Sequence, residues 1–246
     1  MAGRGSRFAN EGYQLPKPLI PVKGYPMIEL VIANLTPRVP HRFHFLILRE
    51  HDKDYGLAER LRCWAPDCSI TYVDTVTEGA ACTVLLARDA INNDDPLMIA
   101  NCDQYVDISI DGYLADIAEA DGLIMTMWAD DDKWSFVRRD DTGRVVEVVE
   151  KVVVSNEATV GIYNFARGAD FVRAAESMIA EDHRVNGEFY VAPVYTRLAQ
   201  EGADIRCHSI GKVGAGMHGL GVPADLKDFE AHPVSARAIA DLPSPS

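Results

Sequence analysis

The 246 residues of the chain are enough for one sizeable domain, and 48% of them are hydrophobic. That fraction supports a continuous core and excludes the disordered and fibrous classes. Lys and Arg number 24 against 37 Asp and Glu, a formal net charge of −13, so the average surface repels nucleic acid and anionic membrane. Any anion that the protein binds must therefore meet a local basic patch.

The first part of the chain alternates predicted helices and strands. Pro26 begins a helix with one apolar face, made by Ile28, Val31, Ile32 and Leu35. Apolar runs predict strands over 43–48, 69–74 and 96–101, and the segments between them predict helices over 52–64 and 79–91. Such alternation is typical of a parallel sheet with helices on both faces.

The pattern changes from residue 122 onward, where strands dominate and polar turns separate them. The expected strands span 122–129, 134–140, 143–151 and 158–165; helices follow over 168–181 and 189–202, then a strand over 203–210 and a helix over 223–231. Residues 236–246 are expected to fray. These elements predict a single α/β domain with a substrate-side insertion.

The cysteines and the apolar runs indicate the cellular compartment of the protein. Its five cysteines are an odd number and include no C-x-x-C pair, which argues against a disulfide framework and a structural zinc site. No apolar run approaches the roughly 20 residues of a membrane helix, and no signal-peptide pattern opens the chain. We therefore expect a cytoplasmic protein without a membrane or nucleic-acid partner.

The opening segment GRGSRF has the composition of an anion-binding loop. Gly3 and Gly5 allow the backbone to approach a ligand closely, and Arg4 and Arg7 supply positive charge. Lys17 follows between two prolines that stiffen its position. A rigid lysine beside a flexible anion loop suits a triphosphate. A plain surface turn is the alternative for the glycines, but it explains neither the lysine nor the prolines.

Three further positions carry candidate chemistry, each with a plainer alternative. Asp103 ends an apolar strand, where open sheets bind ligands, and could hold Mg²⁺; the alternative is a turn residue, although Asn101 and Gln104 beside it favour a site. Lys151 could bind a second anion and Glu150 substrate hydroxyls, or the two are an exposed charge pair. Similarly, the segment NGEFY, which holds Asn186, Glu188 and Tyr190, could simply start the next helix.

The order of the segments MAGRGSRF, PKPLIPVKGYPMI, TEGAACTVL, NCDQ, VVEK, VGIYNF, NGEFY and GLGVPADL resembles the sugar-phosphate nucleotidyltransferase family over nearly the whole chain. That family includes enzymes similar to glucose-1-phosphate thymidylyltransferase. The NCDQ variant resembles members associated with capsule and surface-polysaccharide precursors, some of them cytidylyltransferases. The resemblance implies a Rossmann-like three-layer sandwich with a mainly parallel sheet, of the GT-A type. It also implies one nucleotidyltransferase domain over 1–246, with a nucleotide-binding part (1–110), an acceptor-binding part (111–231) and a tail (232–246).

The activity implied is the coupling of a nucleoside triphosphate to a sugar phosphate or another small phosphorylated acceptor, with release of pyrophosphate. A pyrimidine triphosphate is preferred, and CTP slightly, through the NCDQ segment alone. By the resemblance, the nucleotide contacts Ala2, Gly3, Arg4, Gly5, Ser6, Glu78, Gly79, Ala80 and Asn101, and the catalytic residues are Arg7, Lys17 and Asp103, the last as the Mg²⁺ ligand. The acceptor contacts Glu150, Lys151, Gly161 and Glu188. The oligomeric state is left open, a homo-oligomer included.

The sequence departs from the family pattern at two points. Sugar-specific members supply a second metal carboxylate where this chain has Gly219, so we expect Asp107 or a water to complete the metal shell. The family also has an apolar strand that runs into the glycine loop, whereas this sequence starts at the loop. We therefore expect the first strand to be missing, with Met1 an internal methionine of a longer natural chain.

Two other functions compete with nucleotidyl transfer. A glycosyltransferase of related fold would use a D-x-D string, and Asp130, Asp131 and Asp132 form one; a solvated hairpin turn is the simpler interpretation. A nucleotide-binding regulatory subunit without catalysis would explain the missing carboxylate and strand. Against it, the charged residues of the expected site are all present.

Overall fold

The structure is a computed structural model that describes residues 1–3 and 5–243. By its internal contacts the chain divides into two compact units. The first unit comprises residues 1–76 and 101–111 and the C-terminal segment from Val213; the second comprises 77–100 and 112–212. We describe each unit by itself.

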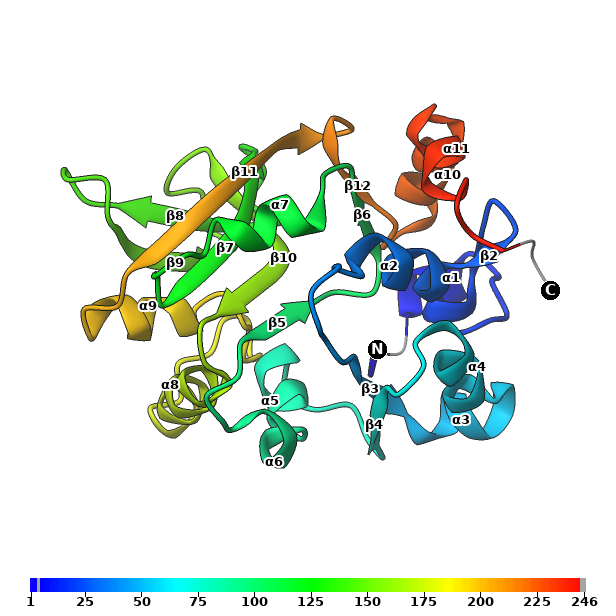
Figure 1. Cartoon of the computed structure of the whole chain (residues 1–246), viewed down its shortest axis with the longest axis horizontal. Helices are drawn as coiled ribbons and strands as arrows, with labels where there is room; N and C mark the ends of the chain where they lie inside the picture. Colours follow the sequence, from blue (N-terminus) through cyan, green and yellow to red (C-terminus); the bar gives the residue numbers. More distant parts are fainter. Residues whose placement is uncertain (4, 244–246) are drawn as a thin grey trace. The chain divides into compact units, whose positions relative to one another are not determined.

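The first unit contains short helices around small sheets (Figure 1). Its elements are α1 (Ser6–Asn10), the 3₁₀ turn η1 (Lys17–Leu19), β1 (Pro21–Val22), β2 (Tyr25–Pro26), α2 (Met27–Leu35), β3 (His44–Leu48), α3 (Arg49–Tyr55), α4 (Leu57–Trp64), β4 (Ser69–Val73), β6 (Gln104–Val106), β12 (Gly216–Gly219), α10 (Pro223–Ala231) and α11 (Val234–Ala238). Strands β3 and β4 pair in parallel, as their apolar runs predict, and β6 pairs antiparallel with β12.

The apolar face predicted for the first long helix lies inside the first unit. The predicted residues Ile28, Val31, Ile32 and Leu35 of α2 are all buried. Met27 and Leu30 of the same helix are buried as well, together with Phe8 of α1 and Phe229 of α10. The expected helix over 52–64 is two helices, because Gly56 adopts the left-handed conformation (φ 60°) that ends α3 and starts α4. Helix α11 lies within the segment assigned to the tail, and its Val234 is fully buried.

The second unit is a sheet covered by helices (Figure 1). Its elements are α5 (Ala80–Leu85), α6 (Arg88–Ile91), β5 (Leu97–Ala100), β7 (Gly122–Trp128), β8 (Ser135–Arg139), β9 (Val145–Glu150), β10 (Glu157–Phe165), α8 (Gly168–Ala180) and α9 (Val194–Gln200), while α7 (Ile110–Ala115) and β11 (Ile205–Val213) begin or end at the boundary between the units. The helix expected over 79–91 is interrupted between α5 and α6.

The long strand β10 organises this sheet. Strands β5, β7 and β8 all pair antiparallel with β10, and β11 pairs in parallel with β7. Consequently β5, β7, β8 and β11 run in the same direction and only β9 and β10 of these strands run the other way. The sheet is mixed with most strands in one direction, as predicted for the α/β class. Phe171, Ala175 and Met178 of α8 are buried against this sheet, at the spacing of one helix face.

Two expectations about the second unit are wrong in detail. The acidic string at 130–132 does not sit in a hairpin, because β7 and β8 lie on opposite sides of β10, where both pair with Ala158 or its neighbours. Helix α9 begins at Val194 after Pro193 rather than at residue 189, because Asn186 and Gly187 adopt positive φ values that turn the chain.

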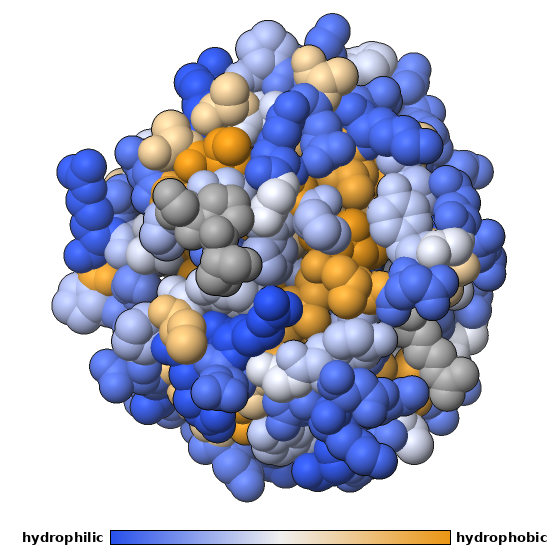
Figure 2. All heavy atoms as spheres, turned by 90° about the vertical axis from the view of Figure 1, so that its right-hand side faces the viewer, coloured by the Kyte–Doolittle hydropathy of each residue, from blue (hydrophilic) through white to orange (hydrophobic). Residues whose placement is uncertain are grey.

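The exterior carries mostly polar residues, with apolar surface gathered near the middle of the face in Figure 2. None of the described helices is long and apolar enough to cross a membrane.

Candidate active site

Lys17 and Asp103 form an ion pair inside the first unit. Lys17 starts the turn η1 between Pro16 and Pro18, and its Nζ lies 2.6 Å from Oδ2 of Asp103, with both side chains 23% exposed. Burial lowers the pKa of Lys17, but Cys102 and Asp103 raise it by more, so its net pKa lies above the ordinary value. The lysine is thus a fixed, fully protonated cation near neutral pH.

The opening loop lies directly against this lysine. Gly5 has a φ of 62°, and a Cβ placed on it would lie 3.1 Å from Cβ of Lys17. Arg7 is exposed on α1 and close enough for its charge to lower the pKa of Lys17. The absence of a side chain at Gly5 therefore lets the loop backbone pass close to Lys17. Arg7 and Lys17, two cations of the predicted site, are neighbours, as the binding of a polyanion requires.

The other residues expected in this loop differ in exposure. Gly3 and Ser6 are exposed, whereas Ala2 is buried against Leu48 and Val73 at the ends of β3 and β4. Arg4 lies outside the described residues. Ala2 therefore serves packing in this unit, and the backbone that follows it is the part that a ligand can reach.

The surroundings of Asp103 suit a divalent cation that keeps most of its water. No cluster of three or more His, Cys, Asp or Glu side chains that could hold a metal occurs among the described residues. Lys17 occupies Oδ2 of Asp103, and Oδ1 has no hydrogen-bond or ion-pair partner in the described part of the chain. A carboxylate with one open oxygen fits Mg²⁺, which binds through one or two carboxylates plus water and phosphate.

Asn101 and Asp107 lie on the same stretch of chain as Asp103. Asn101 is exposed. Asp107 forms an ion pair with Arg237, with Oδ2 at 2.6 Å from Nη2, so its carboxylate is already neutralised. The expectation that Asp107 completes the metal shell is therefore not supported by its contacts.

In the second unit, the segment Glu78–Ala80 is joined to the segment around Phe189. Backbone hydrogen bonds run from the Phe189 amide to Glu78 O (2.8 Å) and from the Ala81 amide to Phe189 O (3.0 Å). Gly79 has a φ of 132°, and a Cβ there would lie 2.3 Å from Phe189 O. Only glycine fits at position 79.

Arg184 holds the Glu78 side chain, a role that the sequence did not reveal. Its Nη2 lies 2.8 Å from Oε2 of Glu78, and its guanidinium carbon lies 4.2 Å from the centre of the Phe189 ring. No local pattern marks the pair of Arg184 and Glu78, because the two residues lie about a hundred positions apart in the chain. The predicted base-reading segment is therefore fixed in place before any ligand binds.

Lys151 is presented by a strained backbone. It has a positive φ of 57°, a conformation that costs a residue with a side chain about 1 kcal/mol or more and is found at functional sites. Its Nζ donates a hydrogen bond to the Tyr190 hydroxyl at 2.6 Å, and this bond raises the pKa of Lys151. The exposed-pair alternative is wrong for this residue, since Lys151 contacts Tyr190 and is only partly exposed.

Glu150 is buried, with 7% of its surface exposed. Its Oε2 accepts a hydrogen bond from the Ser135 hydroxyl. Burial raises the pKa of Glu150 above its ordinary value, although Ser135 and Lys151 both oppose the shift. The alternative of an exposed charge pair is therefore wrong for Glu150, and a buried carboxylate with a raised pKa is a functional-site candidate.

Gly161 and Glu188 complete the expected acceptor residues. Gly161 is buried in β10 with a φ of 82°, where the register with β7 shifts between Thr159 and Tyr163, a bulge of the kind found beside active sites. Glu188 is exposed and forms an isolated bridge with Val185. Since α9 starts only at Val194, Glu188 does not act as a first-turn residue of that helix.

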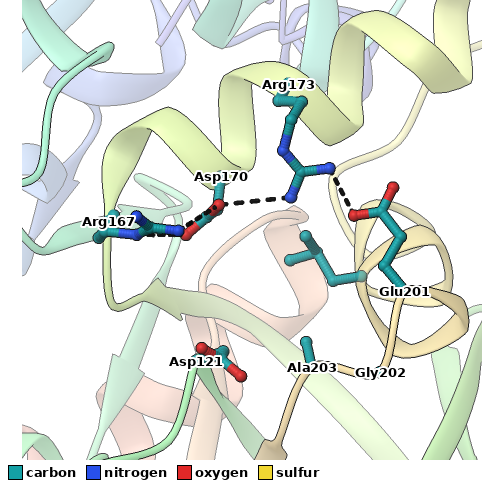
Figure 3. A pocket seen from close by; sticks show the side chains of 8 residues that line it. Asp121, Arg167, Asp170, Arg173, Glu201, Gly202 and Ala203 are labelled. Atoms are coloured by element: carbon teal, nitrogen blue, oxygen red, sulfur yellow. Dashed lines mark hydrogen bonds and ion pairs between the residues drawn. The ribbon is translucent and has the colours of Figure 1, made fainter.

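The second unit also contains a pocket of about 240 Å³ lined largely by charged side chains (Figure 3). Its charged side chains neutralise one another: Arg167 and Arg173 both pair with Asp170, and Arg173 also pairs with Glu201. None of the predicted site residues lines it. Its volume is below the roughly 300 Å³ at which ligand pockets begin, so we do not take it as the active site.

Several solved structures have the same fold. A nucleoside-diphosphate-sugar pyrophosphorylase from Vibrio cholerae RC9 is 26% identical (TM-score 0.79) and covers 94% of this chain and 97% of its own. An inositol-1-phosphate CTP transferase from T. maritima is 14% identical (TM-score 0.75; 98% and 95%). A UDP-glucose pyrophosphorylase complexed with UDP-glucose is 15% identical (TM-score 0.73; 93% and 94%). These confirm the predicted fold class.

The sequence comparisons assign the family. No curated protein sequence matches the chain. The family model described as nucleotidyl transferase matches residues 1–194, which include nearly all the residues discussed above. The chain is an enzyme of the nucleotidyl transferase family.

Proposed function

We propose that the enzyme couples a pyrimidine nucleoside triphosphate to a sugar phosphate or another small phosphorylated acceptor, with release of pyrophosphate. CTP is the favoured triphosphate because the NCDQ segment resembles that of cytidylyltransferases. The product would be an activated precursor of surface polysaccharide, made in the cytoplasm. The five described cysteines, all free thiols, agree with such a reducing compartment.

The observation that carries the proposal is the presence of two separate fixed cations, each beside a carboxylate. Lys17 lies against Asp103 in the first unit, and Lys151 follows the buried Glu150 in the second. Nucleotidyl transfer handles two phosphate compounds, a triphosphate and a phosphorylated acceptor, and a pair of lysines provides one positive charge for each.

In the reaction, an oxygen of the acceptor phosphate attacks the α-phosphorus of the triphosphate. The new bond joins that oxygen to the α-phosphorus, and the bond to the bridging oxygen between the α- and β-phosphates breaks. Pyrophosphate leaves with the electron pair. Because both reactants are anions, the protein's main tasks are to position them and to neutralise the charge that builds up.

The residues divide these tasks. Lys17 would stabilise the negative charge on the α-phosphate, and Arg7 would bind the departing pyrophosphate. The exposed backbone around Gly3 and Gly5 would donate its amides to phosphate oxygens, with Ser6 at the same loop. Mg²⁺, held through Asp103, would supply charge neutralisation and Lewis-acid polarisation of the phosphates. Asn101 beside Asp103 would donate to the nucleotide.

In the second unit, the segment Glu78–Ala80 would contact the base. Support comes from its fixed backbone, since Gly79 is locked against Phe189. Lys151 would bind the acceptor phosphate, and Glu150 would accept hydrogen bonds from acceptor hydroxyls, with Gly161 and Glu188 around them. The Tyr190 hydroxyl, hydrogen-bonded to Lys151, would direct the ammonium group toward that phosphate.

The proposal is tested by pyrophosphate release with Mg²⁺. CTP, UTP, dTTP, ATP and GTP are each incubated with the enzyme and a pool of small phosphorylated acceptors. Release that requires both a pyrimidine triphosphate and an acceptor supports the proposal. Nucleotide binding without release in any combination would instead identify a regulatory subunit, and release with purine triphosphates alone would contradict the proposed base.

A further inference from the structure

The space that a side chain at position 219 would fill is already occupied by a carboxylate. An ideal Cβ built on Gly219 would lie 2.9 Å from Oδ2 of Asp225 and 3.4 Å from its Cγ. Asp225 lies in the first turn of α10 and reaches back to the end of β12. A larger residue at 219 would meet the end of this side chain, which would then have to turn aside.

Asp103 approaches the same short segment two residues later. A Cβ on Gly221 would lie 2.9 Å from Oδ2 of Asp103, and the Leu220 amide donates a hydrogen bond of 2.8 Å to Asp103 O. Gly219 and Gly221 are at most about 7 Å apart along the chain. Both carboxylates therefore lie against one three-residue stretch, and its glycines leave room for them.

A buried amide lies on the same side of the sheet. Gln104 of β6 is directly opposite Gly219 of β12, so its side chain projects from the same face as position 219. It is 4% exposed, and its Nε2 has no hydrogen-bond partner in the described part of the chain. An unmet buried donor costs about 1–3 kcal/mol, and a phosphate oxygen or a metal-bound water would satisfy it.

The Asp225 carboxylate is also available for a ligand. It makes no hydrogen bond or ion pair with the described residues, and its side chain is exposed. Asp107, the alternative raised by the sequence, is neutralised by Arg237. Of these two acidic side chains, Asp225 is the one whose carboxylate lies against the segment that Asp103 touches.

We propose that Asp225 is the second carboxylate ligand of a divalent-cation site with Asp103, so that the carboxylate missing at position 219 is supplied from α10 instead. Two carboxylates are the usual protein share of a Mg²⁺ site, whose remaining positions are taken by water and substrate phosphate. The inference rests on the proposed function for those phosphates, and on the glycine geometry for the choice of Asp225.

The test measures Mn²⁺ binding to the full chain without nucleotide, from the loss of the free-ion signal in electron paramagnetic resonance. We expect Asp225→Ala and Asp103→Ala each to weaken Mn²⁺ binding by about tenfold or more. Asp228→Ala changes the same residue type one turn further along α10, and we expect it to leave binding unchanged. Thermal melts check that all variants are folded.

A relocation variant makes the test specific. Gly219 does not have a left-handed φ, and Asp225→Ala removes the group that a side chain at 219 would meet. The double variant Gly219→Asp with Asp225→Ala should therefore bind Mn²⁺ within about twofold of the wild type, since the carboxylate is restored from the other side. Undiminished binding in Asp225→Ala, or no recovery in the folded double variant, would overturn the inference.

The outcome is separable from that of the proposed function. Wild-type pyrophosphate release combined with normal Mn²⁺ binding in Asp225→Ala would overturn the role of Asp225 alone. Loss of Mn²⁺ binding in Asp225→Ala and recovery in the double variant, without pyrophosphate release by the wild type, would support the cation site and overturn the reaction.

Discussion

The charge of Lys17 can be removed with little change in side-chain length by Lys17→Met. Its Nζ lies 2.6 Å from a carboxylate oxygen, and 23% of the side chain is exposed, so in the proposed site it would contact a phosphate in a partly desolvated place. Two unit charges about 4 Å apart at an effective dielectric constant of about 20 interact by about 4 kcal/mol. About 1.4 kcal/mol corresponds to a tenfold rate change, which sets the upper value near 10³-fold.

Solvent reaches part of this pair, so we expect kcat/KM to fall by about 10²- to 10³-fold, as for the loss of a main electrostatic contact. The assay is pyrophosphate release at saturating acceptor. Lys23→Met is the matched control, because Lys23 is exposed in a turn of the same unit and should retain full activity. A folded Lys17→Met enzyme within about threefold of the wild type would refute the assignment.

Three further predictions concern the second unit. Lys151→Ala should raise KM for the acceptor more than KM for the triphosphate; equal increases would break the division of roles between the two lysines. Because burial raises the pKa of Glu150, its carboxylate takes up a proton at a higher pH than an exposed glutamate would. The KM for the acceptor should therefore rise as the pH falls through this raised pKa, and Glu150→Gln should abolish this pH dependence. Protonation also removes the cost of burying the charge, so acid should not unfold the protein through this residue. Gly79→Ala should destabilise the fold by about 3 kcal/mol or more, seen as a lower melting temperature, whereas Gly143→Ala, with a φ of 85° but open space around it, should cost only the backbone strain; similar melting temperatures would contradict the proposed clash at Phe189.

Apolar runs, together with glycine and proline residues at the ends of elements, predicted most elements of the fold. The runs at 43–48 and 69–74 are β3 and β4, since buried parallel strands read as continuous apolar segments. The break at Gly56 had a signal in the sequence, because glycine commonly ends a helix. The late start of α9 did not, because Phe189 is held by backbone hydrogen bonds to a segment about a hundred residues earlier.

The candidate site was predicted in its residue types but not in its contacts. Lys17 between two prolines and Asp103 at a strand end were recognisable locally, and they are an ion pair. The pairings of Arg184 with Glu78 and of Tyr190 with Lys151 were not, because each joins segments far apart in the chain. Gly219 shows most clearly what the sequence could not predict. The sequence showed that a carboxylate is missing at this position, and only the structure showed that the carboxylate of Asp225 lies beside it.

The central claim is that the acceptor phosphate attacks the α-phosphorus of the triphosphate. The most direct measurement follows label from α-³²P- and γ-³²P-labelled CTP in parallel reactions with an acceptor that supports turnover. The account predicts that α-label enters the acceptor product and γ-label enters pyrophosphate. Appearance of γ-label on the acceptor, or of α-label only in free nucleoside monophosphate, would contradict it.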